Sequence, residues 1–192
     1  MKLLLASLIA LATLGAAAFS ATPAQDPVAG NPKAAVRVII YQDLECPDCA
    51  RWHGVLQNQT IPRFGTQVAF EFRDFPLPQH LWSFNAAVLA RFFDTKAPRI
   101  GMAWRDYCFV HQTDFTPDNL LDKAAAWAAP YGIPRAQLEP VFSRADLFAL
   151  VQADQQRGKR DNVQHTPTVL VDGVEAQSPE QLEQMLSRAT AK

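Results

Sequence analysis

Two cysteines separated by two residues carry the clearest chemistry in this sequence. Cys46 and Cys49 are two of three cysteines in the 192 residues, and they enclose Pro47 and Asp48. The β-branched run at 36–43 predicts a buried strand before the motif, and helix-forming sequence follows it. Cys46 would then cap a helix that has Pro47 at its first position. Free backbone N–H groups and the helix dipole would stabilise a Cys46 thiolate and lower its pKa.

Cys49 has a different predicted role, because it lies one turn inside that helix. Its thiol would be less exposed and would resolve a mixed disulfide formed at Cys46. Two alternatives remain open: a structural disulfide, or a zinc or copper site completed by Cys108 and His111. Cys108 falls in helical sequence, away from the motif, so we interpret it as a buried and unreactive thiol. Redox chemistry at Cys46 and Cys49 is the favoured interpretation.

Acidic residues adjoin the reactive pair. Glu45 directly precedes Cys46, and Asp48 lies within the motif. Negative charge beside a thiolate raises the pKa of the thiol and opposes the helix dipole. Glu45, Pro47 and Asp48 are therefore the residues predicted to tune the Cys46 pKa, and Asp48→His should lower it.

The sequence around the motif has a strand, helix, strand order. Alternating residues at 68–74 predict a second strand, parallel to the first through a right-handed crossover. Helix-forming sequence then fills 80–161 and predicts a helical insertion, with helix starts at Thr116-Pro117 and in a capping box at 143–146. Strand character returns at 168–171, followed by a hairpin turn at 172–173 and a last helix from Ser178. The fold class is therefore α/β.

The N-terminal residues predict export. An apolar run at 3–18 follows Lys2 and ends in small residues, which is typical of a signal peptide cleaved after Ala18 or after Ser20. An uncleaved membrane anchor is the alternative. We expect a signal peptide at 1–20, a flexible leader at 21–35 and a single domain at 36–192. The net charge of −1 argues against a nucleic-acid binder that relies on bulk positive potential.

A second motif lies far from the cysteines in the sequence. Thr166 and Pro167 immediately precede the strand at 168–171, and His165, before them, is expected to face the surface. Several motifs together resemble a DsbA-like thioredoxin-fold protein from about Lys33 to the C-terminus. They are Cys46-Pro47-Asp48-Cys49, the segment 73–77 with His80, the helical insertion, and Thr166-Pro167-Thr168 before Asp172-Gly173.

The resemblance implies a thioredoxin fold with an inserted helical subdomain and an exported thiol–disulfide oxidoreductase. It implies that Cys46 is the nucleophile, Cys49 the resolving cysteine and Pro167 a cis-proline. Thr166 and Pro167 would then bind substrate, because an extended segment can pair with the backbone groups exposed there. Many relatives carry a buried acid at the position of Ile40, and Asp43, Glu45 or water are the candidates to replace it.

We therefore expect a monomeric dithiol oxidase of the bacterial periplasm. Its partners would be exported proteins with thiols or disulfides, and the resemblance suggests a membrane quinone-linked reoxidant of the DsbB or VKOR kind. No organic cofactor, metal or nucleic acid is expected. A disulfide reductase or isomerase is the alternative enzyme, and a copper- or zinc-binding dithiol module is the alternative of another class. Isomerases of this family usually carry an N-terminal dimerisation domain, for which the short leader leaves no room.

Overall fold

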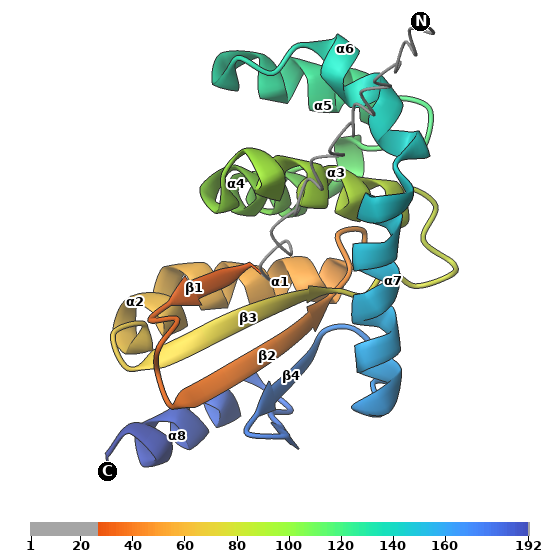
Figure 1. Cartoon of the computed structure of the whole chain (residues 1–192). Helices are drawn as coiled ribbons and strands as arrows, with labels where there is room; N and C mark the ends of the chain where they lie inside the picture. Colours follow the sequence, from red (N-terminus) through yellow and green to blue (C-terminus); the bar gives the residue numbers. More distant parts are fainter. Residues whose placement is uncertain (1–26, 192) are drawn as a thin grey trace, which may run out of the picture.

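A computed structural model describes residues 27–191 of the chain. The predicted signal peptide and the start of the leader lie outside these residues. Within them, five strands form one mixed sheet in the order β1-β3-β2-β4-β5 (Figure 1). The strands are β1 (Val28–Gly30), β2 (Val36–Gln42), β3 (Val68–Asp74), β4 (Thr168–Val171) and β5 (Val174–Glu175).

β2 and β3 form the parallel centre of the sheet, as the strand, helix, strand order predicted. They pair in register, with Gln42 opposite Asp74 at their carboxyl ends. Successive side chains of β2 point to opposite faces, so Val38 and Ile40 pack on one face and Tyr41 packs on the other. Both carboxyl ends therefore reach the same edge of the sheet, where the loop to Cys46 begins.

The predicted hairpin is formed by β4 and β5, which pair antiparallel. Asp172 and Gly173 make its turn with φ angles of +48° and +83°. Glycine reaches positive φ without a steric cost, and aspartate tolerates it better than most residues. β4 also pairs antiparallel with β2, which places the segment that follows Thr166 beside the strand that leads to Cys46.

The leader differs from its prediction, because residues 28–30 of it form β1. This strand pairs antiparallel with the outer edge of β3. Gly30 has a φ of +77°, and a Cβ atom there would collide with the carbonyl oxygen of Val68. The flexible-leader interpretation was therefore wrong at residues 28–30. The sequence did not reveal this strand because three residues are too few to show an alternating pattern.

Helices cover the sheet and fill the predicted insertion. They are α1 (Pro47–Val55), η1 (Leu56–Thr60), α2 (Ile61–Phe64), α3 (Ser83–Lys96), α4 (Pro98–Val110), η2 (Gln112–Asp114), α5 (Leu120–Ala128), η3 (Ala129–Tyr131), α6 (Arg135–Leu138), η4 (Glu139–Ser143), α7 (Ala145–Arg160) and α8 (Pro179–Thr190). The insertion therefore consists of the elements from α3 to α7. Two helix starts differ from their predictions. The helix predicted to start at Thr116-Pro117 begins at Leu120, as α5, and the capping box predicted at 143–146 is absent, because no side-chain hydrogen bond caps α7. Of the helices in residues 27–191, none has the length and hydropathy needed to cross a bilayer.

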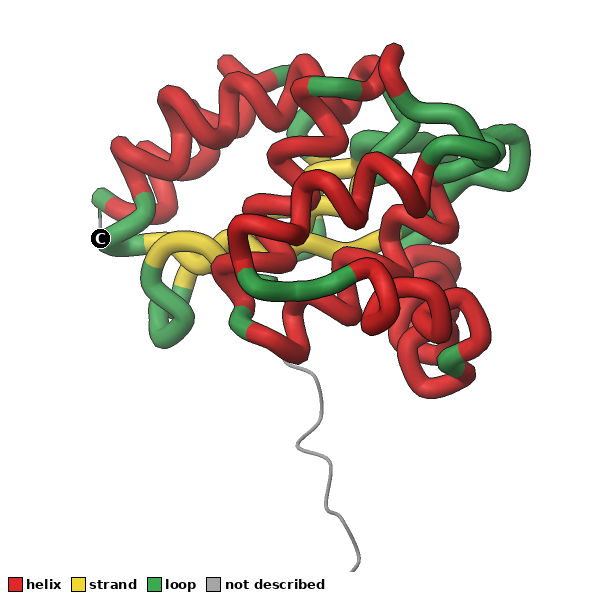
Figure 2. Tube along the Cα trace, turned by 90° about the horizontal axis from the view of Figure 1, so that it is seen from above, coloured by secondary structure: helices red, strands yellow, loops and turns green. Residues whose placement is uncertain are grey.

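The helices lie on both faces of the sheet. Leu56 and Phe64, from the α1–α2 segment, and Leu182, from α8, pack on the face that also carries Val38. α7 approaches the opposite face at Gly158, where a Cβ atom would lie 2.5 Å from the ring of Phe75. In Figure 1 the remaining insertion helices lie above the sheet. Figure 2 views the molecule from that side, so the strands are seen behind these helices.

A buried cluster of charged side chains fastens the insertion to the end of β3. The Asp74 carboxylate accepts hydrogen bonds from Arg105 at 3.1 and 2.8 Å and pairs with Arg91 at 2.7 Å. Arg91 also pairs with Asp154 of α7, and Arg105 pairs with Asp94. Although burial raises the pKa of Asp74, the two guanidinium groups hold it below its ordinary value.

Candidate functional site

The two cysteines of the motif lie at the start of α1, at the joint between the sheet and the insertion. Cys46 is the N-cap residue with an extended backbone, and Pro47 follows in the first turn, as predicted. Both thiols are free and buried, with exposed fractions of 6% for Cys46 and 2% for Cys49. Cys46 is therefore the more accessible of the two sulfurs.

Cys46 has a pKa lowered from the ordinary 9.0 to about 6. The largest cause is a hydrogen bond from the Cys49 side chain, and the Thr166 side chain and the backbone N–H of Cys49 act in the same direction. Burial and the carboxylate of Asp43 oppose them. With a pKa of about 6, the Cys46 thiolate predominates at neutral pH, and the thiolate is the form that can attack a disulfide.

The pKa of Cys49 is shifted in the opposite direction. Burial raises it well above its ordinary value, and the adjacent Cys46 sulfur raises it further. The backbone N–H of Asp43 donates to Cys49 Sγ over 3.4 Å. A buried thiol that stays protonated beside an ionised one has the properties needed in a resolving cysteine.

The Thr166-Pro167 loop lies directly beside Cys46, although 120 residues separate them in the sequence. The peptide bond between Thr166 and Pro167 is cis. The thiol of Cys46 donates a hydrogen bond to the carbonyl oxygen of Thr166 over 3.3 Å. The Thr168 hydroxyl donates to the carbonyl oxygen of His165 at 2.7 Å, which ties the two ends of the loop together. The two sequence motifs thus form one site.

The acidic residues near the cysteines have different surroundings. The Glu45 carboxylate accepts the backbone N–H groups of Trp82, at 2.8 Å, and of Ser83, at 3.2 Å, at the start of α3. Asp48 is exposed and pairs with Arg51 one turn along α1. The carboxylate with a clear effect on the Cys46 pKa is that of Asp43. The tuning roles of Glu45 and Asp48 stay predictions.

Gln112 is a site residue that the sequence did not reveal. Its side-chain amide donates to the carbonyl oxygens of Leu44 and Cys46, both at 2.9 Å. It therefore links η2 of the insertion to the loop that ends at Cys46. A single glutamine after a helix gives no sequence signal, and only the fold brings these segments together.

A cavity of about 350 Å³ opens beside the Thr166-Pro167 loop. Its lining residues are Asp48, Arg51, Trp52, Val55, His165, Thr166, Pro167, Glu175, Ala176, Gln177 and Pro179. His165 is 60% exposed and lies 3.3 Å from Glu175, so the prediction of a surface-facing histidine is confirmed. Trp52, which lines this cavity, also packs against the core of the sheet.

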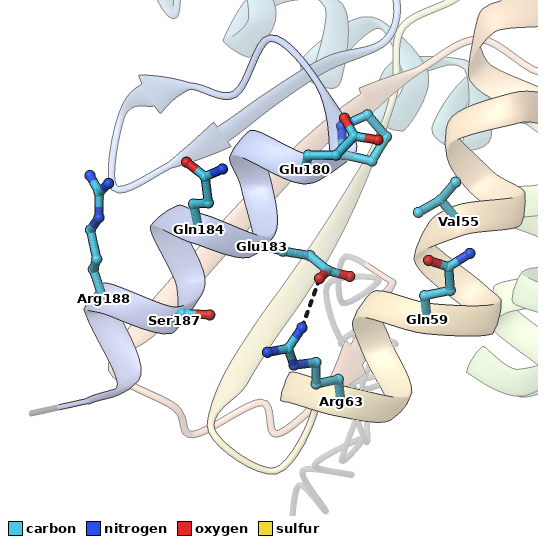
Figure 3. A pocket seen from close by; sticks show the side chains of 9 residues that line it. Val55, Gln59, Arg63, Glu180, Glu183, Gln184, Ser187 and Arg188 are labelled. Carbon is cyan, nitrogen blue, oxygen red and sulfur yellow. Dashed lines mark hydrogen bonds and ion pairs between the residues drawn. The ribbon is translucent and has the colours of Figure 1, made fainter.

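A larger cavity of about 620 Å³ lies between α8 and the segment from the end of α1 to α2 (Figure 3). Figure 3 shows Arg63 reaching across to Glu183, with 2.8 Å between guanidinium and carboxylate. Val55 and Pro179 line both cavities, so the two are adjacent, and neither Cys46 nor Cys49 lines either of them. Apart from Val55 and Pro179, the residues that line the larger cavity are polar or charged.

The third cysteine and the histidine of α1 are buried away from solvent. Cys108 is inaccessible, and burial raises its pKa well above the ordinary value, as expected of an unreactive thiol. His53 lies against Phe109 and its Nε2 is 2.8 Å from Asp106. Among residues 27–191, no three His, Cys, Asp or Glu side chains are grouped so that they could hold a metal ion.

Comparison with known proteins places this chain in a family. A family model described as Thioredoxin matches residues 22–188, which is most of the 192-residue chain. The chain therefore belongs to the thioredoxin family. Among curated proteins it is similar to the Na(+)/H(+) antiporter NhaA 1 of Mycolicibacterium gilvum, with 27% identity over 160 residues. That alignment covers 82% of this chain and 25% of the antiporter, so the chain spans about a quarter of the length of the curated relatives it matches.

Solved structures show the same fold. BdbD from Bacillus subtilis in its oxidised form has a TM-score of 0.72 and 19% identity, over 87% of this chain and 94% of that one. The thiol-disulfide exchange protein alpha-DsbA2 from Wolbachia pipientis has a TM-score of 0.70 and 18% identity, over 85% and 87%. The predicted resemblance to DsbA-like thioredoxin-fold proteins is confirmed at the level of the fold.

Proposed function

We propose that this protein is a thiol–disulfide oxidoreductase that exchanges a Cys46–Cys49 disulfide with protein substrates, acting as a dithiol oxidase. The observation that carries the proposal is the opposite shift of two neighbouring thiols. The pKa of Cys46 is about 6, while that of the buried Cys49 is raised. Because of this asymmetry, Cys46 acts as nucleophile and leaving group, and Cys49 acts as the resolving thiol.

The oxidising reaction transfers two electrons from the substrate to the cysteine pair. A substrate thiolate attacks Cys46 Sγ, the Cys46–Cys49 bond breaks, and Cys49 leaves as a thiolate that takes up a proton. A second substrate thiolate then attacks the substrate sulfur of the mixed disulfide, and Cys46 leaves as a thiolate. The substrate gains a disulfide and the enzyme becomes a dithiol.

The low pKa of Cys46 supports the oxidising direction. Whatever stabilises the thiolate stabilises the reduced enzyme, and a stabilised reduced form makes the disulfide a stronger oxidant. Continued turnover then requires an acceptor for the two electrons. We propose a membrane quinone-linked partner of the DsbB or VKOR kind, on the basis of the DsbA-like resemblance.

The substrate segment would lie against Thr166 and Pro167. The carbonyl oxygen of Thr166 is 3.3 Å from Cys46 Sγ, so a chain that reaches this sulfur passes the loop. The 350 Å³ cavity beside the loop could take side chains that flank the substrate cysteine. The N-terminal sequence supports export to the bacterial periplasm, where such substrates form disulfides, and we propose that the protein acts there as a monomer.

Two assays on the purified protein test this function. Oxidised protein should restore activity to a reduced, unfolded disulfide-containing substrate, and Cys46→Ser should abolish that activity. Cys108→Ala, which changes a buried thiol outside the motif, is the matched control and should retain it. Full oxidative activity in Cys46→Ser would contradict the mechanism.

The alternative functions give different results in the same experiments. A reductase would reduce insulin faster than it oxidises a thiol substrate, and its measured reduction potential would be more negative. A metal-binding module would purify with copper or zinc that is lost when the Cys46–Cys49 disulfide forms.

A further inference from the structure

The carboxylate of Asp43 is the centre of a hydrogen-bond cluster before Cys46. Its Oδ1 accepts the Glu45 N–H at 2.8 Å and the hydroxyl of Ser83. Its Oδ2 accepts the Leu77 N–H at 2.6 Å, and His80 Nδ1 lies at the same distance. A carboxylate only accepts hydrogen bonds, so His80 Nδ1 carries the proton. We call these four donors and the carboxylate the Asp43 cluster.

The backbone of Asp43 faces the resolving sulfur. Its N–H donates to Cys49 Sγ over 3.4 Å, so one residue connects the Asp43 cluster to a reacting atom. The carboxylate is fully buried, whereas His80 is 19% exposed. Three of the four donors come from the segment 77–83, which leads into the insertion. The position of this N–H is therefore fixed by residues outside β2 and α1.

We propose that Asp43 and His80 are positioning residues that hold the Asp43 N–H on Cys49 Sγ while that sulfur carries negative charge. This inference rests on the proposed disulfide exchange and adds the residues that assist its buried sulfur. It also gives the insertion a part in the reaction, because Ser83 is its first residue and His80 lies in the segment that leads into it.

The charge on Cys49 arises in one defined step. When a thiolate bonds to Cys46 Sγ, the Cys46–Cys49 bond breaks and its electron pair leaves on Cys49 Sγ. In the reverse direction the Cys49 thiolate attacks Cys46 and expels the other thiolate. Both directions pass through the same transition state, in which a fixed N–H donor stabilises the developing charge. Hydrogen bonds to an ionised acceptor are roughly twice as strong as neutral ones, so the donor favours the transition state.

The test uses the full-length protein with its Cys46–Cys49 disulfide formed by oxidised glutathione. Excess dithiothreitol then reduces it, and acid quenching with mass spectrometry follows the rate. We expect His80→Ala to slow this reduction about tenfold, the effect of weakening one hydrogen bond to a charged group. His80→Asn keeps an N–H donor near the position of Nδ1 and should recover most of the rate. His111→Ala removes an exposed histidine that follows α4 and contacts Asp114 and the ring of Tyr107, and it should leave the rate unchanged.

Thermal unfolding of each variant separates positioning from loss of fold. If His80→Ala does not fold, Ser83→Ala removes another donor to the same carboxylate and should slow the reduction by a smaller factor. Equal rates in wild type and the folded variants, or an equal loss in His80→Asn and His80→Ala, would overturn the inference. This test uses dithiothreitol, whereas the oxidase assay uses a protein substrate. Unchanged reduction rates in the variants would therefore overturn the roles of Asp43 and His80 without contradicting the proposed oxidase activity.

Discussion

The side chain of Cys49 makes the largest contribution to the low pKa of Cys46. We therefore expect Cys49→Ala to raise the pKa of Cys46 from about 6 toward its ordinary value. The rate of iodoacetamide alkylation of reduced protein as a function of pH measures this shift, because only the thiolate reacts. Cys108→Ala is the matched control and should titrate like the wild type. A Cys49→Ala variant with an unchanged titration would contradict the assigned cause.

The charge of Asp48 gives a second prediction at the residue scale. Asp48→His removes a carboxylate from the first turn of α1 and introduces a group that can carry positive charge. The Cys46 pKa should fall and the reduction potential should become more positive. Arg51→Gln should act in the opposite direction, because Asp48 loses its cationic partner. Both shifts should shrink at high salt, since the residues are exposed. Shifts of the same sign in both variants would exclude this electrostatic cause.

At the scale of elements, the Asp74 carboxylate holds α3 and α4 against the end of β3. Asp74→Ala leaves the guanidinium groups of Arg91 and Arg105 buried without this partner. Breaking a buried ion pair by removing one member costs about 3–5 kcal/mol of unfolding free energy. Urea unfolding measures the loss, and Asp146→Ala, at an exposed pair with Arg144, should change stability by less than about 1 kcal/mol. Similar losses in both variants would show that burial does not set the cost.

The sequence predicted the elements whose patterns are local. The strands at 36–42, 68–74 and 168–171 have dense β-branched or alternating residues, and the start of α8 has Ser178 as its side-chain cap. β1 was missed because it is too short to have a period. The chemistry predicted for the cysteine motif depends on only four consecutive residues, and it stays a prediction that the oxidation assays test.

The rest of the site depends on contacts that the sequence does not encode locally. The amide of Gln112 reaches the carbonyl oxygen of Cys46 across 66 residues, and His80 reaches Asp43 across 37. The charge of Glu45 was evident from the sequence, but its bonds to the start of α3 were not. Residue type and spacing thus predict which groups react, while the fold determines which groups assist them.

In the whole molecule, Cys46 and Cys49 lie at the start of α1, between the sheet and the insertion. The sheet and α1 position the sulfurs, and Cys46 and Cys49 belong to the core that continues into the insertion. Asp43, Glu45 and Gln112 connect the loop before Cys46 to that insertion. The insertion is therefore part of the structure that sets the site, and changes in the ionisation of Cys46 should affect the stability of the whole domain.

This coupling predicts how stability depends on pH. The Cys46 pKa is about 6 in the folded, reduced protein and about 9 when unfolded, so the unfolded state binds more protons between these values. The stability of the reduced form should therefore rise with pH above about 6, and this contribution should be lost as pH falls through 6. Below about pH 8 the ordinary thiol pKa keeps Cys49 and Cys108 protonated in both states, so they do not contribute.

The disulfide form provides the reference for this measurement, because it has no ionisable thiol at Cys46. Urea midpoints of the two forms are compared at about pH 5 and about pH 8, and their difference isolates the Cys46 thiolate from the histidines common to both. We expect the reduced form to gain stability relative to the oxidised form as pH rises. Cys46→Ser, which cannot form the disulfide, should show the same pH dependence of stability as the oxidised wild type. A difference that is constant with pH would mean that folding does not stabilise the thiolate, and the basis for an oxidising enzyme would be lost.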